Sequence, residues 1–242
     1  MIEHLLHINH VCKHFGGNVA VSDISFSVDE KQIFGLIGPN GAGKTTLFNC
    51  ISGFFPVTSG DIIFDNKIIN KLRPDEVCHL GMARTWQRVK PLGSLTVLEN
   101  VMIGAFSITN ATRKAEEIAF EQLGLVGLSD YATKPAGSLS IGLKKKLELA
   151  RVLATRPKML LLDEICGGLN LTETDTILDI IREVRRKGAT IVFIEHDMKA
   201  VTAICDWIVV LNSGEKLAEG RPEEITRNPD VIEAYLGGGQ NA

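Results

Sequence analysis

The sequence lacks the features of a disulfide-bonded, metal-binding or membrane-spanning chain. Its cysteines are scattered, with no C-x-x-C pair and no metal-ligand spacing, which is typical of small apolar residues in a reducing compartment. The five are Cys12, Cys50, Cys78, Cys166 and Cys205. The start has no basic region followed by an apolar core, and no apolar run approaches the roughly 18 residues that a spanning helix needs. We therefore expect a soluble, cytosolic protein.

An excess of charge of one sign is also absent. A net charge of −3 with 23% charged residues describes an ordinary soluble surface, so no global basic field indicates nucleic acid as a partner. The one basic run, Lys144-Lys145-Lys146, is interpreted as the solvated face of a helix rather than a nucleic-acid patch. At 242 residues the chain is long enough to bury a substantial core, in one large α/β domain or two small ones.

A cluster of histidines near the start does not have the pattern of a metal site. Its members are His4, His7, His10 and His14. The stretch 5–11 alternates apolar and polar residues as a half-buried strand does, and no carboxylate or cysteine completes a ligand set. We interpret these histidines as ordinary strand residues.

What the sequence does contain is one strong phosphate-binding pattern. The loop consists of Gly38, Pro39, Asn40, Gly41, Ala42, Gly43, Lys44, Thr45 and Thr46. A glycine, four free positions and Gly-Lys-Thr allow successive backbone N–H groups to turn inward around phosphate oxygens. The apolar run 33–37 before the loop predicts a buried strand, and 44–50 begins a helix whose positive N-terminal end would face the anion. A polyphosphate is therefore the expected ligand, the alternative being a glycine-rich turn that matches by chance.

The periodicity on both sides of this loop is that of an α/β chain. A second alternating run at 24–28 predicts an antiparallel β layer that leads into the loop strand. The helical pattern of 96–128, bordered by glycines and prolines between 91 and 137, predicts a helical insertion. Further strands are expected at 61–65, 82–87, 159–162 and 189–194, helices at 74–79 and 172–187, a hairpin around 212–214 and a helical tail over 222–236.

Polar residues follow two of the buried strands. Asp163 and Glu164 end the run 159–162, and His196 stands just after the run 189–194. The carboxyl ends of parallel strands are where ligands of open α/β sheets gather, so these side chains are candidates for the site. Phe15, at a probable turn, is either plain core or an aromatic that stacks on a base.

Taken in chain order, these features resemble the ATPase subunit of ATP-binding cassette (ABC) transporters over essentially the whole chain. The matching features are the phosphate loop, Gln87, Leu139-Ser140-Ile141-Gly142-Leu143 in place of the family's signature, Asp163-Glu164, Asn170 and His196. Within the family, the stretches most similar to the branched-chain amino acid importer's ATPase are the phosphate loop, 84–87, 168–170, 195–199 and the ending 228–237.

The resemblance implies an ABC ATPase fold. This is an α/β P-loop NTPase core with a mainly parallel sheet, an antiparallel β layer and an α-helical subdomain. It implies a single domain over 1–242, with a RecA-like core at 1–87 and 157–242 and a helical subdomain at 88–156 that includes the signature helix.

The resemblance also implies roles for residues at the phosphates. Lys44 would neutralise the β- and γ-phosphates of ATP, and Thr45 would bind Mg²⁺ through its hydroxyl, because phosphoryl transfer needs charge stabilisation. Asp163 would hold the ion through water, and Glu164 would polarise the attacking water as general base. His196 would keep that water and the γ-phosphate in line.

Other matching positions would complete the site. Gln87 would touch metal or water and report occupancy to the helical insertion, and Phe15 matches the family's adenine-stacking aromatic. Ser140 and Gly142 of one subunit would cover the γ-phosphate bound to the phosphate loop of another, so ATP would hold a dimer together. Hydrolysis would open the dimer, and membrane subunits docked on the helical insertion would feel the motion.

The partners implied are a second ATPase subunit in a homodimer or a heterodimer, transmembrane permease subunits and, indirectly, a periplasmic binding protein, with no nucleic acid. The implied location is the cytoplasmic face of the inner membrane. Three residues depart from the family's usual pattern: Ile141 replaces Gly, Leu143 replaces Gln and Ile165 replaces the Pro after the catalytic acid. We nevertheless expect ATP binding and hydrolysis, since the residues with assigned chemistry are retained.

Three other functions fit parts of the pattern. Lipopolysaccharide export uses an ATPase with the same motifs. A soluble ABC ATPase of DNA repair or translation usually carries a long coiled-coil insertion or two cassettes, whereas one phosphate loop is present here. The altered signature would also suit a nucleotide-binding assembly module with weak catalysis.

Overall fold

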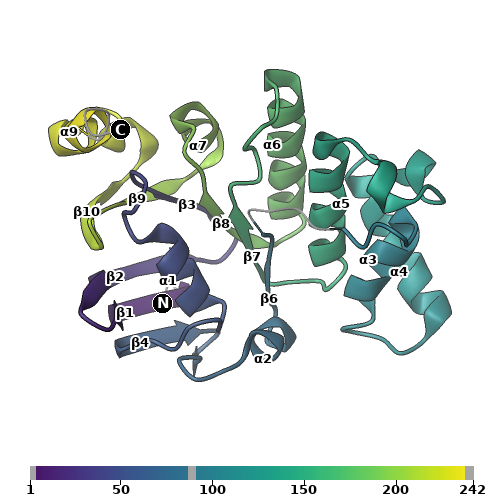
Figure 1. Ribbon diagram of the computed structural model, residues 1–242, viewed down its shortest axis with the longest axis horizontal. Helices are drawn as coiled ribbons and strands as arrows, with labels where there is room; N and C mark the ends of the chain where they lie inside the picture. The colour runs from purple at the N-terminus through teal and green to yellow at the C-terminus, as the bar shows by residue number, and fades with distance from the viewer. Residues whose placement is uncertain (1–3, 87–90, 238–242) are drawn as a thin grey trace.

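A computed structural model describes residues 4–86 and 91–237 of the chain. Its first part is a four-stranded antiparallel sheet of order β2-β1-β4-β5, seen at the lower left of Figure 1. The strands are β1 (His4–Phe15), β2 (Asn18–Asp29), β4 (Ser59–Phe64) and β5 (Lys67–Ile68). Leu6 and Ile8 of β1 are fully buried and lie opposite Val28 and Phe26 of β2, which follows from the period-two alternation. The predicted antiparallel layer is confirmed.

A second sheet of six strands has the order β10-β9-β3-β8-β7-β6. Its strands are β3 (Ile33–Ile37), β6 (Met82–Arg84), β7 (Met159–Asp163), β8 (Thr190–Ile194), β9 (Trp207–Asn212) and β10 (Glu215–Gly220). All neighbouring pairs are parallel except β9 and β10, which form the predicted hairpin. Every residue of β3, β7 and β8 is buried, as expected of parallel strands covered on both faces. The carboxyl ends of five strands consequently lie along one edge.

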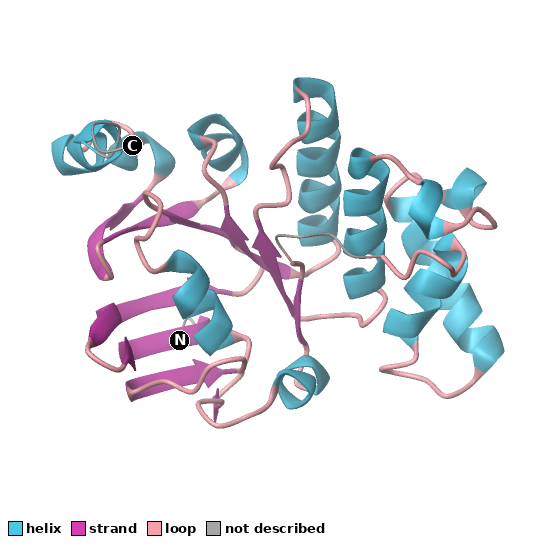
Figure 2. Cartoon of the chain, viewed as in Figure 1, coloured by secondary structure: helices cyan, strands magenta, loops and turns pink. Residues whose placement is uncertain are grey.

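Helices surround this second sheet and form a separate group beside it (Figures 1 and 2). The α-helices are α1 (Lys44–Ile51), α2 (Pro74–His79), α3 (Val97–Ala105), α4 (Thr112–Leu125), α5 (Ile141–Leu153), α6 (Leu171–Arg186), α7 (Met198–Ile204), α8 (Pro222–Ile225) and α9 (Pro229–Gly237). Two short 3₁₀ helices, Ser129–Tyr131 and Ala136–Ser138, connect α4 to α5. The helical insertion at 96–128 is confirmed as α3 and α4, which pack against each other and against α5.

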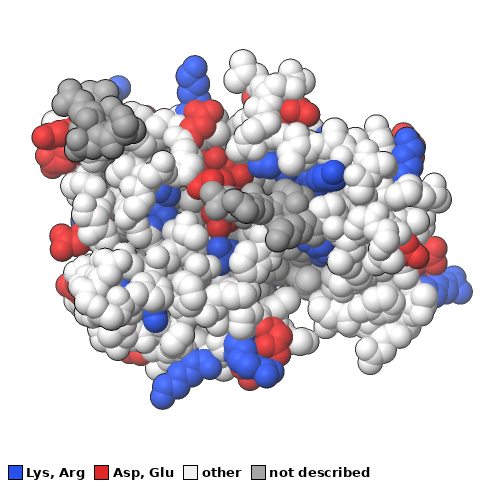
Figure 3. Space-filling view, in the orientation of Figure 1, with Lys and Arg blue, Asp and Glu red and all other residues white. Residues whose placement is uncertain are grey.

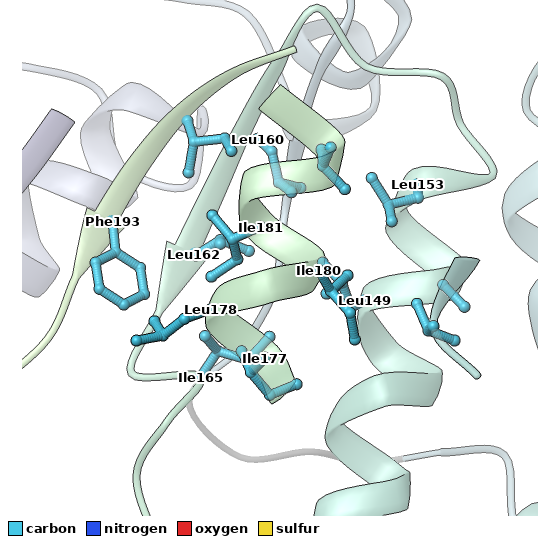
Figure 4. Close-up of a cluster of buried hydrophobic side chains, with 14 of the residues drawn as sticks. Leu149, Leu153, Leu160, Leu162, Ile165, Ile177, Leu178, Ile180, Ile181 and Phe193 are labelled. Atoms are coloured by element: carbon cyan, nitrogen blue, oxygen red, sulfur yellow. The ribbon is translucent and has the colours of Figure 1, made fainter. Parts of the chain in front are cut away.

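Helix α6 packs between the central sheet and α5 (Figure 4). Its buried residues Ile177 and Ile181 recur at helical spacing, and Ile181 lies beside Leu162 of β7 on one side. Leu149 of α5 lies on the other side. Asn170 caps α6, and Glu173 bonds back to the backbone N–H of Asn170, so the start of the helix is well defined.

The interpretation of the basic run as a solvated helix face is wrong for its middle member. Lys145 is 5% exposed, whereas Lys144 and Lys146 are half-buried. A helix turns by about 100° per residue, so three consecutive lysines point in different directions, and the second points toward the end of β7. Elsewhere on the molecule, acidic and basic side chains are interspersed over the face shown in Figure 3.

The C-terminal helices differ from the predicted pattern, whereas the histidines near the start lie where it places them. The sequence patterns did not indicate α7, and the expected tail consists of two helices, α8 and α9, separated by a break before Pro229. The histidines lie on β1 as predicted, and His4 and His10 bond to Asp29 and Asp23. Within residues 4–86 and 91–237 no group of three or more metal-binding side chains occurs, and no helix is both long and apolar enough to cross a membrane.

Candidate functional site

The phosphate loop connects β3 to α1 and lies against the backbones of two other strands. Gly38 has a φ of 146°, and a Cβ atom added there would stand 2.1 Å from the carbonyl oxygen of Leu211 in β9. Gly43 has a φ of 94°, and its Cβ would stand 2.5 Å from the carbonyl oxygen of Ala20 in β2. Glycine is therefore required at both positions by conformation and by close approach. Gly43 caps α1 without a side chain, which leaves the first N–H groups of the helix available to an anion.

Lys44 lies inside this loop. Its side chain is buried, and Nζ donates hydrogen bonds to the carbonyl oxygens of Gly38 (2.7 Å) and Pro39 (2.9 Å). Burial lowers the pKa of Lys44, while the negative charges of Glu164 and Asp163 oppose that shift. The ammonium group is thus held at the loop by carbonyl groups that a phosphate can replace as partners.

A cavity of about 450 Å³ opens in front of the loop. It is lined by Asn18, Val19, Ala20, Asn40, Gly41, Ala42, Gly43, Lys44, Thr45, Thr46, Glu164, His196, Ser213 and Gly214. The sequence patterns do not predict that β2 (18–20) and the β9–β10 turn (213–214) line this cavity. The glycine at 214 indicates a turn, but only the pairing of distant strands places that turn against the phosphate loop, where the N–H of Gly214 bonds to the carbonyl of Ala42.

Two predicted side chains meet at the edge of this cavity. Oε1 of Glu164 and Nε2 of His196 are 2.5 Å apart, a short hydrogen bond between the ends of β7 and β8. Glu164 has a φ of 50°, the left-handed region that a residue with a side chain seldom adopts. Its own N–H bonds to the carbonyl of Ile194, so the adjacent strand helps to hold this conformation. The carboxylate and the imidazole therefore face the same space as the phosphate loop.

Asp163 is buried and forms an ion pair with Arg84. Oδ2 of Asp163 lies 2.7 Å from Nη2 of Arg84, and the two side chains are 1% and 7% exposed. The guanidinium also donates to the side-chain oxygens of Asn49 and Ser52 on and just after α1. The other oxygen of Asp163, Oδ1, is buried without a hydrogen-bond partner among the described residues. An orphaned carboxylate oxygen of this kind suits a cation or a cation-bound water.

Arg84 opens the stretch 84–87, and the sequence pattern predicts no role for it. Its isolated position on a short strand carried no signal of burial. The structure places its guanidinium 5.3 Å from the ring centroid of Phe48 and 4.7 Å from that of Trp86, so aromatic faces cover the charge.

Helix α5 contributes two buried charges to the strand ends. Nζ of Lys145 donates to the carbonyl oxygen of Glu164 (3.0 Å), and Oε1 of Glu148 accepts from the N–H of Trp86 (2.7 Å). A third buried group, Glu195, accepts from the N–H of Cys166 (2.6 Å). Burial raises the pKa of Glu148 and of Glu195 and lowers that of Lys145. Sequence patterns did not identify these residues as part of the site.

Three other predicted residues, Ser140, Gly142 and Phe15, do not line the cavity. Ser140 caps α5, where its hydroxyl accepts from the N–H of Leu143, and a Cβ on Gly142 would stand 2.5 Å from Oε1 of Glu173. Phe15 is 43% exposed at the end of β1 and packs edge-on against Phe55. Gln87 lies outside the described residues.

Comparisons with known proteins agree with this arrangement. The family model described as "ABC transporter" matches residues 21–167, and the model described as "Branched-chain amino acid ATP-binding cassette transporter" matches residues 215–240. The chain is 42% identical to the high-affinity branched-chain amino acid transport ATP-binding protein LivG of Salmonella typhimurium (strain LT2), over 98% of this chain and 99% of that protein.

Solved structures give the same result. The ADP conformation of an ATP-binding cassette of an ABC transporter has a TM-score of 0.89 and 34% identity, covering 97% of this chain and 99% of that one. A dimeric bacterial ABC transporter cassette has a TM-score of 0.81 and 25% identity, covering 90% and 98%. The predicted fold class is thereby confirmed.

Proposed function

Because this chain belongs to the ABC transporter family of ATP-binding and ATP-hydrolysing cassettes, we propose that it powers the import of branched-chain or related amino acids. The relative with 42% identity carries that transport in its name, and the second family model matches the C-terminal region at 215–240. The same two matches favour import over lipopolysaccharide export, soluble DNA-repair or translation ATPases and a weakly catalytic assembly module.

One observation carries the chemical part of this proposal. A single cavity brings the phosphate loop together with the Glu164–His196 pair, although these segments lie more than a hundred residues apart in the chain. Lys44 and the N–H groups at the start of α1 supply positive charge for the phosphates. Glu164 acts as general base toward a water, and His196 orients that carboxylate and the water.

Magnesium fits the residues that are present. Thr45 offers a hydroxyl on the cavity wall, and Asp163 offers a buried oxygen that has no hydrogen-bond partner within residues 4–86 and 91–237. Mg²⁺ held there would neutralise charge on the phosphate oxygens. Asp163 would hold the ion through water, and Gln87 is proposed as a further contact.

A second copy of this chain, or a related subunit, completes the site. Ser140 and Gly142 stand at the start of α5, outside the cavity of their own chain. A helix N-terminus with a serine hydroxyl is a suitable partner for a terminal phosphate presented by another subunit. The dimeric cassette with 25% identity supports this assembly.

The assembly is proposed to act at the cytoplasmic face of a membrane, with transmembrane permease subunits and, indirectly, a periplasmic binding protein. The group α3, α4 and α5 falls within the helical subdomain proposed at 88–156, on which those permeases would dock. The core would then comprise 1–87 and 157–242. Phe15 is proposed to stack on adenine from the exposed end of β1.

The chemistry is tested by ATP turnover of the purified chain and of its Glu164→Gln variant. The amide keeps the shape of the carboxylate but is not a base, so turnover should fall by about 100-fold or more while ATP binding is retained. Unchanged turnover would refute the assignment of the base.

The transported substrate is tested by deleting the chain in its host and measuring uptake of labelled leucine, isoleucine and valine. Uptake should fall, and it should return with the wild-type chain but not with Glu164→Gln. Histidine uptake is the control. Unchanged uptake of all three branched-chain amino acids in the deletion strain would contradict the proposed substrate.

A further inference from the structure

Lys145 connects the helix that begins at Ser140 to the backbone of the proposed general base. Its ammonium group lies 3.0 Å from the carbonyl oxygen of Glu164, and the side chain is 5% exposed. A lysine is rarely buried to this degree unless its charge has partners. The carboxylates of Glu195 and Glu148 supply the negative field around it.

The same turn is held from its other side by Glu195. This carboxylate is 3% exposed and accepts from the N–H of Cys166 at 2.6 Å. Both peptide groups that flank Ile165 are therefore hydrogen-bonded to charged side chains. The carbonyl of Glu164 accepts from Lys145 of α5, and the N–H of Cys166 donates to Glu195, which follows β8.

These two hydrogen bonds help to hold the backbone conformation of Glu164. Glu164 is in the left-handed region with a φ of 50°, which is unfavourable for a residue with a side chain and persists only where the surroundings impose it. Ile165 is buried but cannot fix its own φ angle as a proline does. Two backbone hydrogen bonds hold the turn, from the N–H of Glu164 to the carbonyl of Ile194 and from the N–H of Gly167 to the carbonyl of Glu164. The hydrogen bond from Lys145 and the one to Glu195 add to these and fix the peptides on both sides of Ile165, which sets the direction of the Glu164 side chain.

We propose that Lys145 is a positioning residue for ATP hydrolysis: by holding the carbonyl of Glu164, it aims the Glu164 carboxylate at His196 and the cavity. The proposal rests on the proposed role of Glu164 as general base. It also links α5 to the chemistry, since Lys145 lies one turn after Ser140 and Gly142. A change in the direction of α5 would move the base.

The alternative is that Lys145 only neutralises buried carboxylates. The two roles differ in what happens when both charges are removed. Lys145→Met deletes the donor and the charge at similar length, while Glu195→Gln removes the negative charge but keeps an oxygen that accepts from Cys166. The double variant removes the positive charge together with the carboxylate that acts on it most strongly, and Arg151 still acts on the remaining carboxylate, Glu148. A purely neutralising role therefore predicts recovery of both stability and activity.

The experiment measures turnover at saturating ATP, ATP affinity and thermal unfolding for the full-length chain. Lys145→Met should lower turnover by about 10- to 100-fold, the loss of one hydrogen bond from a charged donor, with ATP affinity within about twofold of wild type. Lys145→Arg, which keeps a charged donor, should stay within about threefold. The matched control is Lys146→Met, at a half-buried position on the same helix, which should leave turnover unchanged.

The double variant Lys145→Met/Glu195→Gln decides between the roles, and also serves if Lys145→Met fails to fold. We expect its unfolding temperature to recover toward that of Glu195→Gln while its turnover stays at least about tenfold below that of Glu195→Gln. Turnover of the double variant within about threefold of Glu195→Gln would overturn the proposal, as would an equal loss in Lys146→Met. Glu164→Gln, assayed in parallel, separates the hypothesis that Glu164 is the base from the hypothesis that Lys145 positions it. If Glu164→Gln retains turnover, the assigned base is wrong. If Glu164→Gln loses turnover while Lys145→Met turns over normally, only the positioning role of Lys145 is wrong.

Discussion

Replacing Arg84 by Met should destabilise the folded chain strongly, although Arg84 is not expected to touch ATP. The variant removes the guanidinium that lies 2.7 Å from Asp163 and leaves that carboxylate 1% exposed without its ion-pair partner. It also removes the donors to Asn49 and Ser52, which attach β6 to α1 and to the residue that follows it. Methionine fills much of the space beside Phe48, so the loss is mainly electrostatic.

The magnitude follows from the burial of the pair. Despite their mutual attraction, burial raises the pKa of Asp163 and lowers that of Arg84, so desolvation outweighs the pairing for each group. Removing one partner of such a pair costs about 3–5 kcal/mol, because the other charge is left uncompensated. At about 2–4 °C per kcal/mol for a domain of this size, the unfolding temperature should fall by about 6–20 °C.

The assay is urea unfolding at pH 7.5 without nucleotide or Mg²⁺. Arg84→Met/Asp163→Asn removes both charges and should recover to within about 1–2 kcal/mol of wild type. Arg113→Met is the control, because Arg113 is 93% exposed and its ion pair with Glu117 should contribute less than about 0.5 kcal/mol. The reasoning is refuted if Arg84→Met costs less than about 1 kcal/mol, or if the double variant is as unstable as the sum of the two single variants.

Three further predictions concern the loop, the thiols and a buried acid. Gly38→Ala should abolish ATP binding, measured by titration with a fluorescent ATP analogue, because its Cβ would stand 2.1 Å from the carbonyl oxygen of Leu211; binding within threefold of wild type would contradict this. Three thiols are buried, those of Cys50, Cys166 and Cys205, and burial raises the pKa of each, to about 11 for Cys50. These three thiols should react with a disulfide reagent at pH 8 only after denaturation, and their rapid reaction in the folded chain would contradict the structure. Burial raises the pKa of Glu195, so the folded state binds the proton of this carboxyl more tightly than the unfolded state does. Urea unfolding should therefore show wild type gaining stability relative to Glu195→Gln as pH falls from 8 toward 4.5. A difference in unfolding free energy that stays constant over this range would exclude the raised pKa.

Local patterns in the sequence were sufficient for the phosphate loop and for most of the elements, α7 being one that they did not indicate. Alternation over 5–11 and 24–28 predicted two antiparallel strands, and the apolar runs before the loop and before Asp163 predicted buried parallel strands. These predictions hold because side-chain period and strand burial are properties of a few consecutive residues. The glycines of the loop belong to the same class, since their conformation is needed within the loop itself.

Local patterns do not predict contacts between residues that are far apart in the chain. Lys145 belonged to a run that reads as solvent-exposed, and Arg84 stood on a three-residue strand with no periodicity to indicate its burial. Whether a charged side chain is buried depends on which partner lies opposite, and that partner is 19 residues away for Lys145 and 79 for Arg84.

By itself, then, the sequence determined most of the strands and helices, the phosphate loop and the polar residues at the strand ends, because local periodicity and glycine conformation decide them. Only the tertiary structure decided that Glu164 meets His196 in front of the loop, that Asp163 pairs with Arg84 and that Lys145 holds the backbone of Glu164. Those contacts depend on how parallel strands and α5 are brought together, and the free energy of a buried charge is set by neighbours that folding supplies.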